Sequence, residues 1–134
     1  MPHLTILYTP ELESLSDMTA LCRKLADTML AQRDEAGAAV FPPGGIRVLA
    51  YPAAHSAVAD GKRDYSFAYL NLRMGRGRSE PVKQQAGDAL VATARSHFGA
   101  LFEQRHLGLT LQIDEGAEVY DAKHSTIHPL FAKR

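Results

Sequence analysis

The chain has 134 residues, of which 46% are hydrophobic and 22% are charged, a composition typical of an ordinary single-domain globular protein. Its 15 basic residues balance its 15 acidic ones, which argues against a general nucleic-acid-binding surface. The single cysteine excludes an intrachain disulfide framework, and no run of roughly 18 apolar residues predicts a membrane span. Because the N-terminus lacks a signal-peptide pattern, we expect a cytoplasmic protein with no membrane or nucleic-acid partner.

The first half of the chain contains two strand patterns and one helix pattern. Residues 3–8 alternate apolar side chains and predict a strand. Apolar residues then recur at helical spacing over 15–32, after a Ser14 to Asp17 segment that resembles a capping box. A loop over 37–45 leads to a second predicted strand at 46–51.

The second half repeats this order. Residues 65–74 predict a long strand. After a glycine-flanked turn, Ser79 and Pro81 begin a helix that we expect to extend to about residue 105. Alternating apolar residues over 107–113 predict the fourth strand, and the last twenty residues of the chain are expected to be irregular.

These elements predict two strand–helix–strand units, over about 2–55 and 64–115. They form a single domain of residues 1–134 that ends in a tail at 116–134. A crossover through one helix makes the strands of each unit parallel and right-handed. The expected fold is α+β, a two-layer arrangement of a four-stranded mixed sheet with both helices on one face. Its other face is uncovered in a monomer, which predicts an oligomer.

Pro2 is the first candidate catalytic residue. If Met1 is removed, the usual fate before a small residue, the Pro2 nitrogen becomes a free secondary amine. A terminal α-amino group has a pKa of about 7.7–8.0, and burial next to cations lowers that pKa toward neutrality. Such a group suits general acid–base catalysis, although many chains begin Met-Pro without a catalytic role.

Two arginines are candidates for anion binding. Arg47 starts an apolar strand, and Arg78 lies in the glycine-flanked turn before the second helix. Glycines let backbone N–H groups approach a ligand, and a helix N-terminus favours anions. A guanidinium also matches a carboxylate with two hydrogen bonds. From the local sequence alone, solvated arginines in a tight turn are the simpler interpretation.

Other residue types give weaker signals. His124 and His128 have a ligand spacing for a helix, but their segment is a poor helix with no evident third ligand, so no metal is expected. We expect His97 to be a hydrogen-bonded core histidine, and Cys22, on the apolar stripe of the first helix, to be a packing residue. The absence of a Gly-x-Ser-x-Gly motif gives no support to a nucleophilic hydrolase.

Seven short motifs along the chain occur in the same order as in one known protein family. They are Met1-Pro2-His3, Phe41-Pro42 with Gly45-Ile46-Arg47, Asp60-Gly61 followed by Asp64-Tyr65 and Phe67, Gly77-Arg78-Ser79, Gln84-Gln85-Ala86-Gly87, His97-Phe98 and His128-x-Leu130-Phe131. Through them the chain resembles, from Pro2 to Phe131, the 5-carboxymethyl-2-hydroxymuconate delta-isomerase family of the tautomerase superfamily. The resemblance implies a homotrimer of β-α-β-β-α-β subunits with inward-facing sheets.

The resemblance also implies a function. The expected substrate is a small unsaturated dicarboxylate or tricarboxylate, a 2-hydroxymuconate-type dienol acid that is isomerised to its 2-oxo form in bacterial degradation of homoprotocatechuate. Carried over residue by residue, Pro2 is the catalytic base and acid. Arg47 and Arg78 then have catalytic and substrate-binding roles, and no cofactor or metal is expected.

Extra residues near 31–40 and over 53–57 could reshape the pocket, so alternatives stay open. One is a related tautomerase with a different unsaturated oxo acid as substrate. Another is a dehalogenase, which needs water-activating carboxylates near the proline, and for which Glu11 and Glu13 are the candidates. The third is a non-catalytic trimeric binding module.

Overall fold

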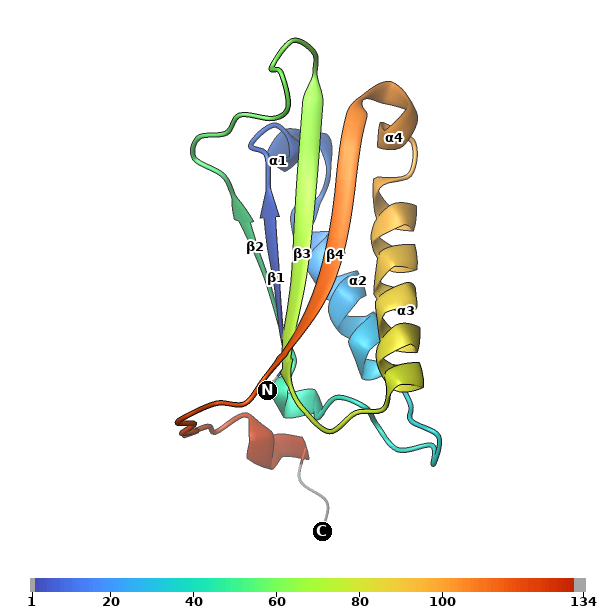
Figure 1. Cartoon of the computed structure of the whole chain (residues 1–134), viewed down its shortest axis with the longest axis vertical. Coiled ribbons are helices and arrows are strands. Elements are labelled where there is room, and N and C mark those ends of the chain that lie inside the picture. The colour runs from blue at the N-terminus through green and yellow to red at the C-terminus, as the bar shows by residue number, and fades with distance from the viewer. Residues whose placement is uncertain (1, 132–134) are drawn as a thin grey trace.

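The computed structural model describes residues 2–131 of the chain. A single four-stranded sheet, in the order β2-β1-β3-β4, is covered on one side by two long helices (Figure 1). The strands are β1 (His3–Tyr8), β2 (Arg47–Pro52), β3 (Tyr65–Gly75) and β4 (His106–Gly116), and the long helices are α2 (Met18–Leu30) and α3 (Glu80–Phe98). The predicted β-α-β-β-α-β order, the mixed sheet and the two helices on one face are confirmed.

The sheet consists of two parallel pairs joined by an antiparallel contact. β1 pairs in parallel with β2, with His3 opposite Arg47, and β3 pairs in parallel with β4. β1 and β3 are antiparallel, with His3 opposite Arg73. The starts of β1 and β2 and the end of β3 therefore lie together, at what we call the Pro2 end of the sheet. The opposite end, where β1 finishes, is called the Tyr8 end.

The core lies between the sheet and the helices because strand side chains alternate between the two faces. In β1, Leu4 and Ile6 are fully buried toward the helices, whereas His3 and Leu7 lie on the other face. The buried residues of the two long helices are Met18, Leu21, Leu25 and Met29 of α2, and Val82, Ala86, Leu90, Ala94 and Phe98 of α3. Each fully buried leucine contributes about 1.5–3 kcal/mol to folding.

The first helical region differs from the prediction over 15–32. A short helix, α1 (Leu12–Leu15), precedes α2, and the two are separate elements. The N-cap of α2 is Asp17, whose carboxylate accepts a hydrogen bond from a backbone N–H of the first turn at 2.9 Å. Ser14 is not the N-cap of α2, because it lies within α1, where its hydroxyl donates to the Glu11 carbonyl. The capping chemistry therefore belongs to the last residue of the predicted segment.

The second helical region ends earlier than the predicted residue 105. Ser79 is the N-cap of α3, as predicted. Gly99 ends the helix with a φ of +45°, a backbone conformation that glycine adopts more readily than other residues. A separate short helix, α4 (Leu101–Gln104), then leads into β4.

The sheet face opposite the helices is uncovered, as predicted. Three of its large apolar side chains, Leu7, Leu49 and Tyr51, are about half exposed. They come from the neighbouring strands β1 and β2 and share the same face because Leu7 is paired with Tyr51. An apolar surface of this kind is typical of a protein–protein contact.

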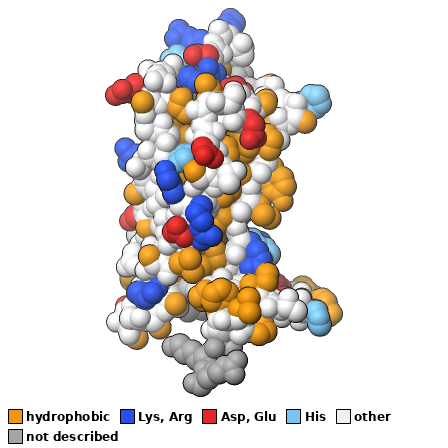
Figure 2. Space-filling model, turned by 180° about the vertical axis from the view of Figure 1, so that it is seen from behind, with side chains coloured by type: hydrophobic (Ala, Val, Ile, Leu, Met, Phe, Trp, Pro, Cys, Tyr) orange, Lys and Arg blue, Asp and Glu red, His pale blue; other side chains and the backbone are white. Residues whose placement is uncertain are grey.

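The segment beyond β4 is irregular, as predicted, except for a short 3-10 helix, η2 (His128–Phe131). η2 packs against η1 (Pro43–Gly45), the turn before β2, and both lie close to the N-terminus in Figure 1. Hydrophobic side chains gather in the lower part of the molecule in Figure 2. In the tail, Ile127 and Leu130 are exposed. None of the described helices combines the length and apolar character needed to cross a membrane.

Candidate active site

Pro2 immediately precedes β1 and is fully buried. Its carbonyl accepts a hydrogen bond from the Arg47 N–H at 3.3 Å, which continues the ladder between β1 and β2. Extending the β1–β3 register by one residue sets Pro2 opposite Met74. The fate of Met1, which decides whether the Pro2 nitrogen is an amine, lies outside the described residues.

Arg47 is the first residue of β2 and is partly buried. Its Nη1 donates hydrogen bonds to the carbonyl oxygens of Gly44 at 2.6 Å and Ile46 at 3.0 Å, so the guanidinium folds back over η1. It borders two cavities. One, of about 540 Å³, has a largely apolar wall that includes Ile46. The other, of about 370 Å³, is formed with residues 122–127 of the tail.

Arg78 lies in the turn between β3 and α3. Gly77 before it has a φ of +121°, which side-chain-bearing residues rarely adopt. The Nε and Nη2 of Arg78 donate to the Val40 carbonyl at 3.2 and 3.1 Å, and Nη1 donates to the Gly75 carbonyl at 3.1 Å. The guanidinium carbon is 5.1 Å from the centroid of the Phe41 ring, a cation–π distance. The glycine turn thus holds Arg78 against the loop before η1.

The three predicted site residues share the Pro2 end of the sheet. Arg47 is hydrogen-bonded to Pro2 through the β1–β2 ladder. Arg78 donates to the carbonyl of Gly75, which follows Met74, the residue opposite Pro2. Among the described residues, no carboxylate lies within ion-pair distance of either guanidinium. Their hydrogen bonds go to neutral carbonyls, so both positive charges remain available to an anion.

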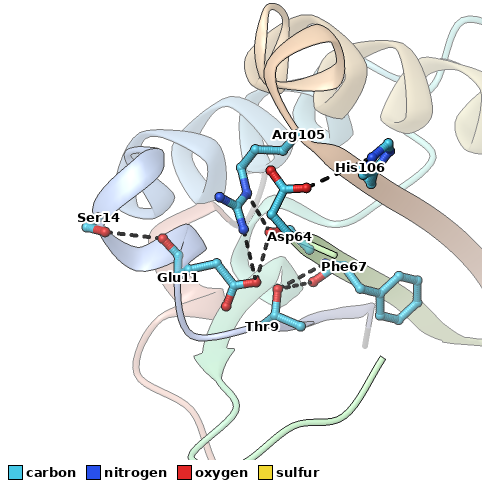
Figure 3. A network of polar contacts seen from close by, with 8 residues as sticks. Thr9, Glu11, Ser14, Asp64, Phe67, Arg105 and His106 are labelled. Atoms are coloured by element: carbon cyan, nitrogen blue, oxygen red, sulfur yellow. Dashed lines mark hydrogen bonds and ion pairs between the residues drawn. The ribbon is translucent and has the colours of Figure 1, made fainter. Parts of the chain in front are cut away.

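Glu11, a candidate for water activation, lies at the Tyr8 end, roughly 20 Å from Pro2 along an extended strand. Figure 3 shows it in a polar network. It accepts a hydrogen bond from the Ser66 hydroxyl at 2.8 Å, and Arg105 Nη2 is 3.9 Å from the same carboxylate oxygen. Burial acts to raise the pKa of Glu11. Hydrogen bonds from its own backbone, Ser66 and Thr9, with the charge of Arg105, outweigh burial and lower that pKa.

Glu13 is at the same end and accepts a hydrogen bond from the Tyr8 hydroxyl. Burial, followed by this hydrogen bond and the charge of Glu13, raises the pKa of Tyr8 to about 12. Both acidic residues that could have activated water are therefore engaged in contacts remote from Pro2. The dehalogenase alternative receives no support from them.

The tail residues around η2 lie beside Arg47, and the sequence predicted no role for them. Ile127 lines both cavities beside Arg47, and Phe131 lines the larger one. The available signal was the His128-x-Leu130-Phe131 motif, which contributed to the resemblance without indicating a function.

The remaining candidates have mainly packing roles. Cys22 packs against the core, as predicted, and burial raises its pKa. His97 was expected in the core but is only partly buried. Its Nδ1 is 3.1 Å from the Lys24 ammonium, and its Nε2 has no hydrogen-bond partner among the described residues. Burial and the charge of Lys24 lower the pKa of His97. Within residues 2–131, no group of three or more His, Cys, Asp and Glu side chains is arranged to hold a metal ion.

Comparison with known proteins identifies the family. A family model described as 5-carboxymethyl-2-hydroxymuconate isomerase matches residues 2–131. The chain belongs to this family. The 5-carboxymethyl-2-hydroxymuconate Delta-isomerase of Escherichia coli is 32% identical over 131 residues, which cover 98% of this chain and 99% of the relative.

Two solved structures agree with this assignment over nearly the whole chain. One is a crystal structure of 5-carboxymethyl-2-hydroxymuconate delta-isomerase, with 56% identity and a TM-score of 0.95, covering 100% of this chain and 95% of that one. The other is a 5-carboxymethyl-2-hydroxymuconate isomerase from Deinococcus radiodurans R1, with 40% identity and a TM-score of 0.87. That match covers 98% of this chain and 95% of the other.

Proposed function

We propose that this protein is an isomerase that converts 5-carboxymethyl-2-hydroxymuconate, a dienol acid, to its unsaturated 2-oxo isomer. Family membership and three relatives named for this reaction support the substrate class. The observation that carries the proposal is the pair of guanidiniums, Arg47 and Arg78, at the same end of the sheet as Pro2. Neither has a carboxylate partner among the described residues.

In this proposal, Pro2 transfers the proton. After removal of Met1 its neutral amine takes the proton from the substrate's 2-hydroxyl, which leaves a dienolate. The same nitrogen, now protonated, returns the proton at carbon, so the double bonds shift and no proton is gained or lost overall. An amine with a pKa near working pH is suited to both steps, and nearby cations keep it neutral.

The arginines hold the substrate and stabilise the charge that develops on it. Arg78 binds one carboxylate or the 2-oxygen, and Arg47 binds a second carboxylate. Fixed cations beside a developing dienolate lower the barrier because they are oriented before the reaction begins. The carbonyl partners of both guanidiniums support this role, since they hold the side chains without neutralising them.

We further infer that three copies assemble with their sheets facing inward. The uncovered face, with half-exposed Leu7, Leu49 and Tyr51, supports a contact there. Light scattering on the purified protein tests this inference: a mass of three chains is expected. A stable monomer would contradict it, and Leu49→Lys is expected to shift an existing trimer toward smaller species.

The deciding test of the function is ultraviolet-monitored conversion of 5-carboxymethyl-2-hydroxymuconate, with removal of Met1 verified by mass spectrometry. Pro2→Ala leaves a primary amine and is expected to lower kcat by at least about 100-fold, within the range contributed by general acid–base catalysis. Absence of conversion by correctly processed wild type would overturn the substrate assignment. Equal turnover by wild type and Pro2→Ala would overturn the role of Pro2.

A further inference from the structure

The tail turn η2 lies directly on the turn that holds Arg47. A Cβ added to Gly44 would lie 2.8 Å from the Cα of His128, 3.0 Å from its Nδ1 and 3.2 Å from its backbone nitrogen. Real Cβ atoms essentially never approach backbone that closely. Only a glycine therefore lets the two turns meet here, and His128 forms the surface against which Gly44 rests.

The backbone of the same glycine also contacts the side chain of Arg47. The Gly44 carbonyl accepts the 2.6 Å hydrogen bond from Nη1 of Arg47. A continuous set of contacts thus runs from His128 through Gly44 to the guanidinium. Any movement of η1 away from η2 moves the carbonyl that fixes the orientation of Arg47.

η2 is itself a fixed element. The Ser125 hydroxyl accepts hydrogen bonds from the backbone N–H groups of Ile127 at 3.0 Å and His128 at 3.3 Å. The Leu130 N–H donates to the Ile127 carbonyl at 3.0 Å, which closes the turn. His128 Nε2 is buried and has no hydrogen-bond partner among the described residues. An unpaired buried nitrogen costs free energy, so packing against η1, rather than that nitrogen's polar contacts, accounts for the position of the ring.

We propose that His128 is a positioning residue, which holds η1 and thereby aims the Arg47 guanidinium into the two cavities beside it. The proposal rests on the proposed function only for its kinetic consequence, because the contact between the turns is independent of any substrate. The tail is then part of the substrate site, with Ile127 and Phe131 as walls and His128 as the support of its cation.

The first readout needs no substrate. Hydrogen exchange at the backbone amides of residues 44–47 is expected to become at least tenfold faster in His128→Ala. Leu130→Ala is the matched control, because Leu130 belongs to the same turn but is 77% exposed and lines neither cavity beside Arg47. Gly44→Ala forces the turns apart from the other side and is expected to have the same effect as His128→Ala.

The second readout is a double-mutant cycle on the isomerisation. His128→Ala is expected to raise KM about tenfold with little change in kcat, the pattern of weakened uniform binding. In an Arg47→Ala background the same substitution is expected to change KM less than twofold, because its effect passes through Arg47. A purely structural role would lower Tm and give the same KM factor in both backgrounds.

The outcomes separate the two proposals. Faster exchange with the non-additive cycle supports the positioning role. Exchange in His128→Ala and Gly44→Ala that matches Leu130→Ala overturns it, as does a KM factor that is equal in both backgrounds. If processed wild type does not convert the substrate, the proposed function fails, and the exchange data still decide whether His128 holds η1. If His128→Ala does not fold, Gly44→Ala supplies both readouts.

Discussion

The two ends of the sheet hold their arginines in different ways. At the Tyr8 end, Arg105 Nε donates to the Ser66 hydroxyl at 3.1 Å, and the guanidinium lies beside the Glu11 carboxylate (Figure 3). At the Pro2 end, Arg47 and Arg78 donate only to backbone carbonyls among the described residues. At the Tyr8 end the positive charge of the arginine is paired with a carboxylate of the fold. At the Pro2 end the guanidiniums are held in place by carbonyls, and their positive charges are not neutralised.

This difference fits the roles proposed above, in which Arg105 is structural and Arg47 and Arg78 bind an anionic substrate. A partly buried cation without a counter-ion costs free energy in the unliganded protein, and a bound carboxylate recovers that cost. The Tyr8 end has nothing to gain from an anion, because a carboxylate is already present. Arginine substitutions at the Pro2 end should therefore lower catalytic efficiency, whereas an arginine substitution at the Tyr8 end should lower stability and leave catalysis nearly unchanged.

Among the arginine substitutions, the largest expected effect is on catalysis at the Pro2 end. Arg78→Ala is expected to lower kcat/KM by about 10- to 100-fold, because a hydrogen bond to a charged group contributes about 1.5–3 kcal/mol. Steady-state kinetics measures this loss. Arg76→Ala, which removes an exposed arginine from the same turn, is the control. Equal losses in the two variants would mean that general positive charge, rather than a placed guanidinium, binds the substrate.

The next effect is on stability at the Tyr8 end. Arg105→Met is expected to lower the free energy of unfolding by about 1–3 kcal/mol, because the buried Ser66 hydroxyl loses a donor and Glu11 loses its cation. Urea unfolding followed by circular dichroism measures the change. The kinetic constants of the folded variant should stay within about twofold of wild type. A folded Arg105→Met with strongly reduced kcat would show that the two ends are not separate in function.

The decline of the unfolding free energy at acidic pH tests the same polar network around Glu11. The pKa of Glu11 is lowered in the fold, so its carboxylate contributes stability above its unfolded pKa, and that contribution is lost as pH falls through the lower folded pKa. Glu11→Gln should flatten the decline in unfolding free energy below about pH 5, relative to the exposed control Glu103→Gln. An unchanged decline at acidic pH would show that Glu11 does not stabilise the fold through its charge.

The comparison of the two ends also explains how far the sequence could be interpreted. The strands and the layer of helices follow from local alternation, as in Leu4 and Ile6 of β1, so they could be predicted. The capping residue within the Ser14 to Asp17 segment could not be fixed in this way, because Ser and Asp both cap helices. The structure separates them, since Asp17 accepts the backbone hydrogen bond at the start of α2, whereas Ser14 lies within α1.

The site shows the same limit more strongly. Pro2, Arg47 and Arg78 could be named from short motifs, but their missing counter-charge depends on three strands meeting at one end of the sheet. The contact between Gly44 and His128 joins residues far apart in the chain. Neither residue carries a local signal for it, since glycines are common in turns of every kind and a histidine in a tail is most often solvated.

The smallest predicted effect is on stability and concerns the contact between Lys24 and His97, which joins the two long helices away from both ends of the sheet. Lys24 on α2 donates to Nδ1 of His97 on α3, which requires a neutral imidazole. Burial, and secondarily Lys24, lower the pKa of His97, while Asp17 opposes them. The stability that comes from this neutral histidine is therefore present above its unfolded pKa of about 6.5 and is lost as pH falls through the lower folded pKa.

His97→Gln should remove a shallow decline in unfolding free energy below about pH 6.5. Lys24→Met should reduce that decline without abolishing it, because burial is the larger cause. A slope that is unaffected by His97→Gln in urea titrations at several pH values would assign the decline to another group.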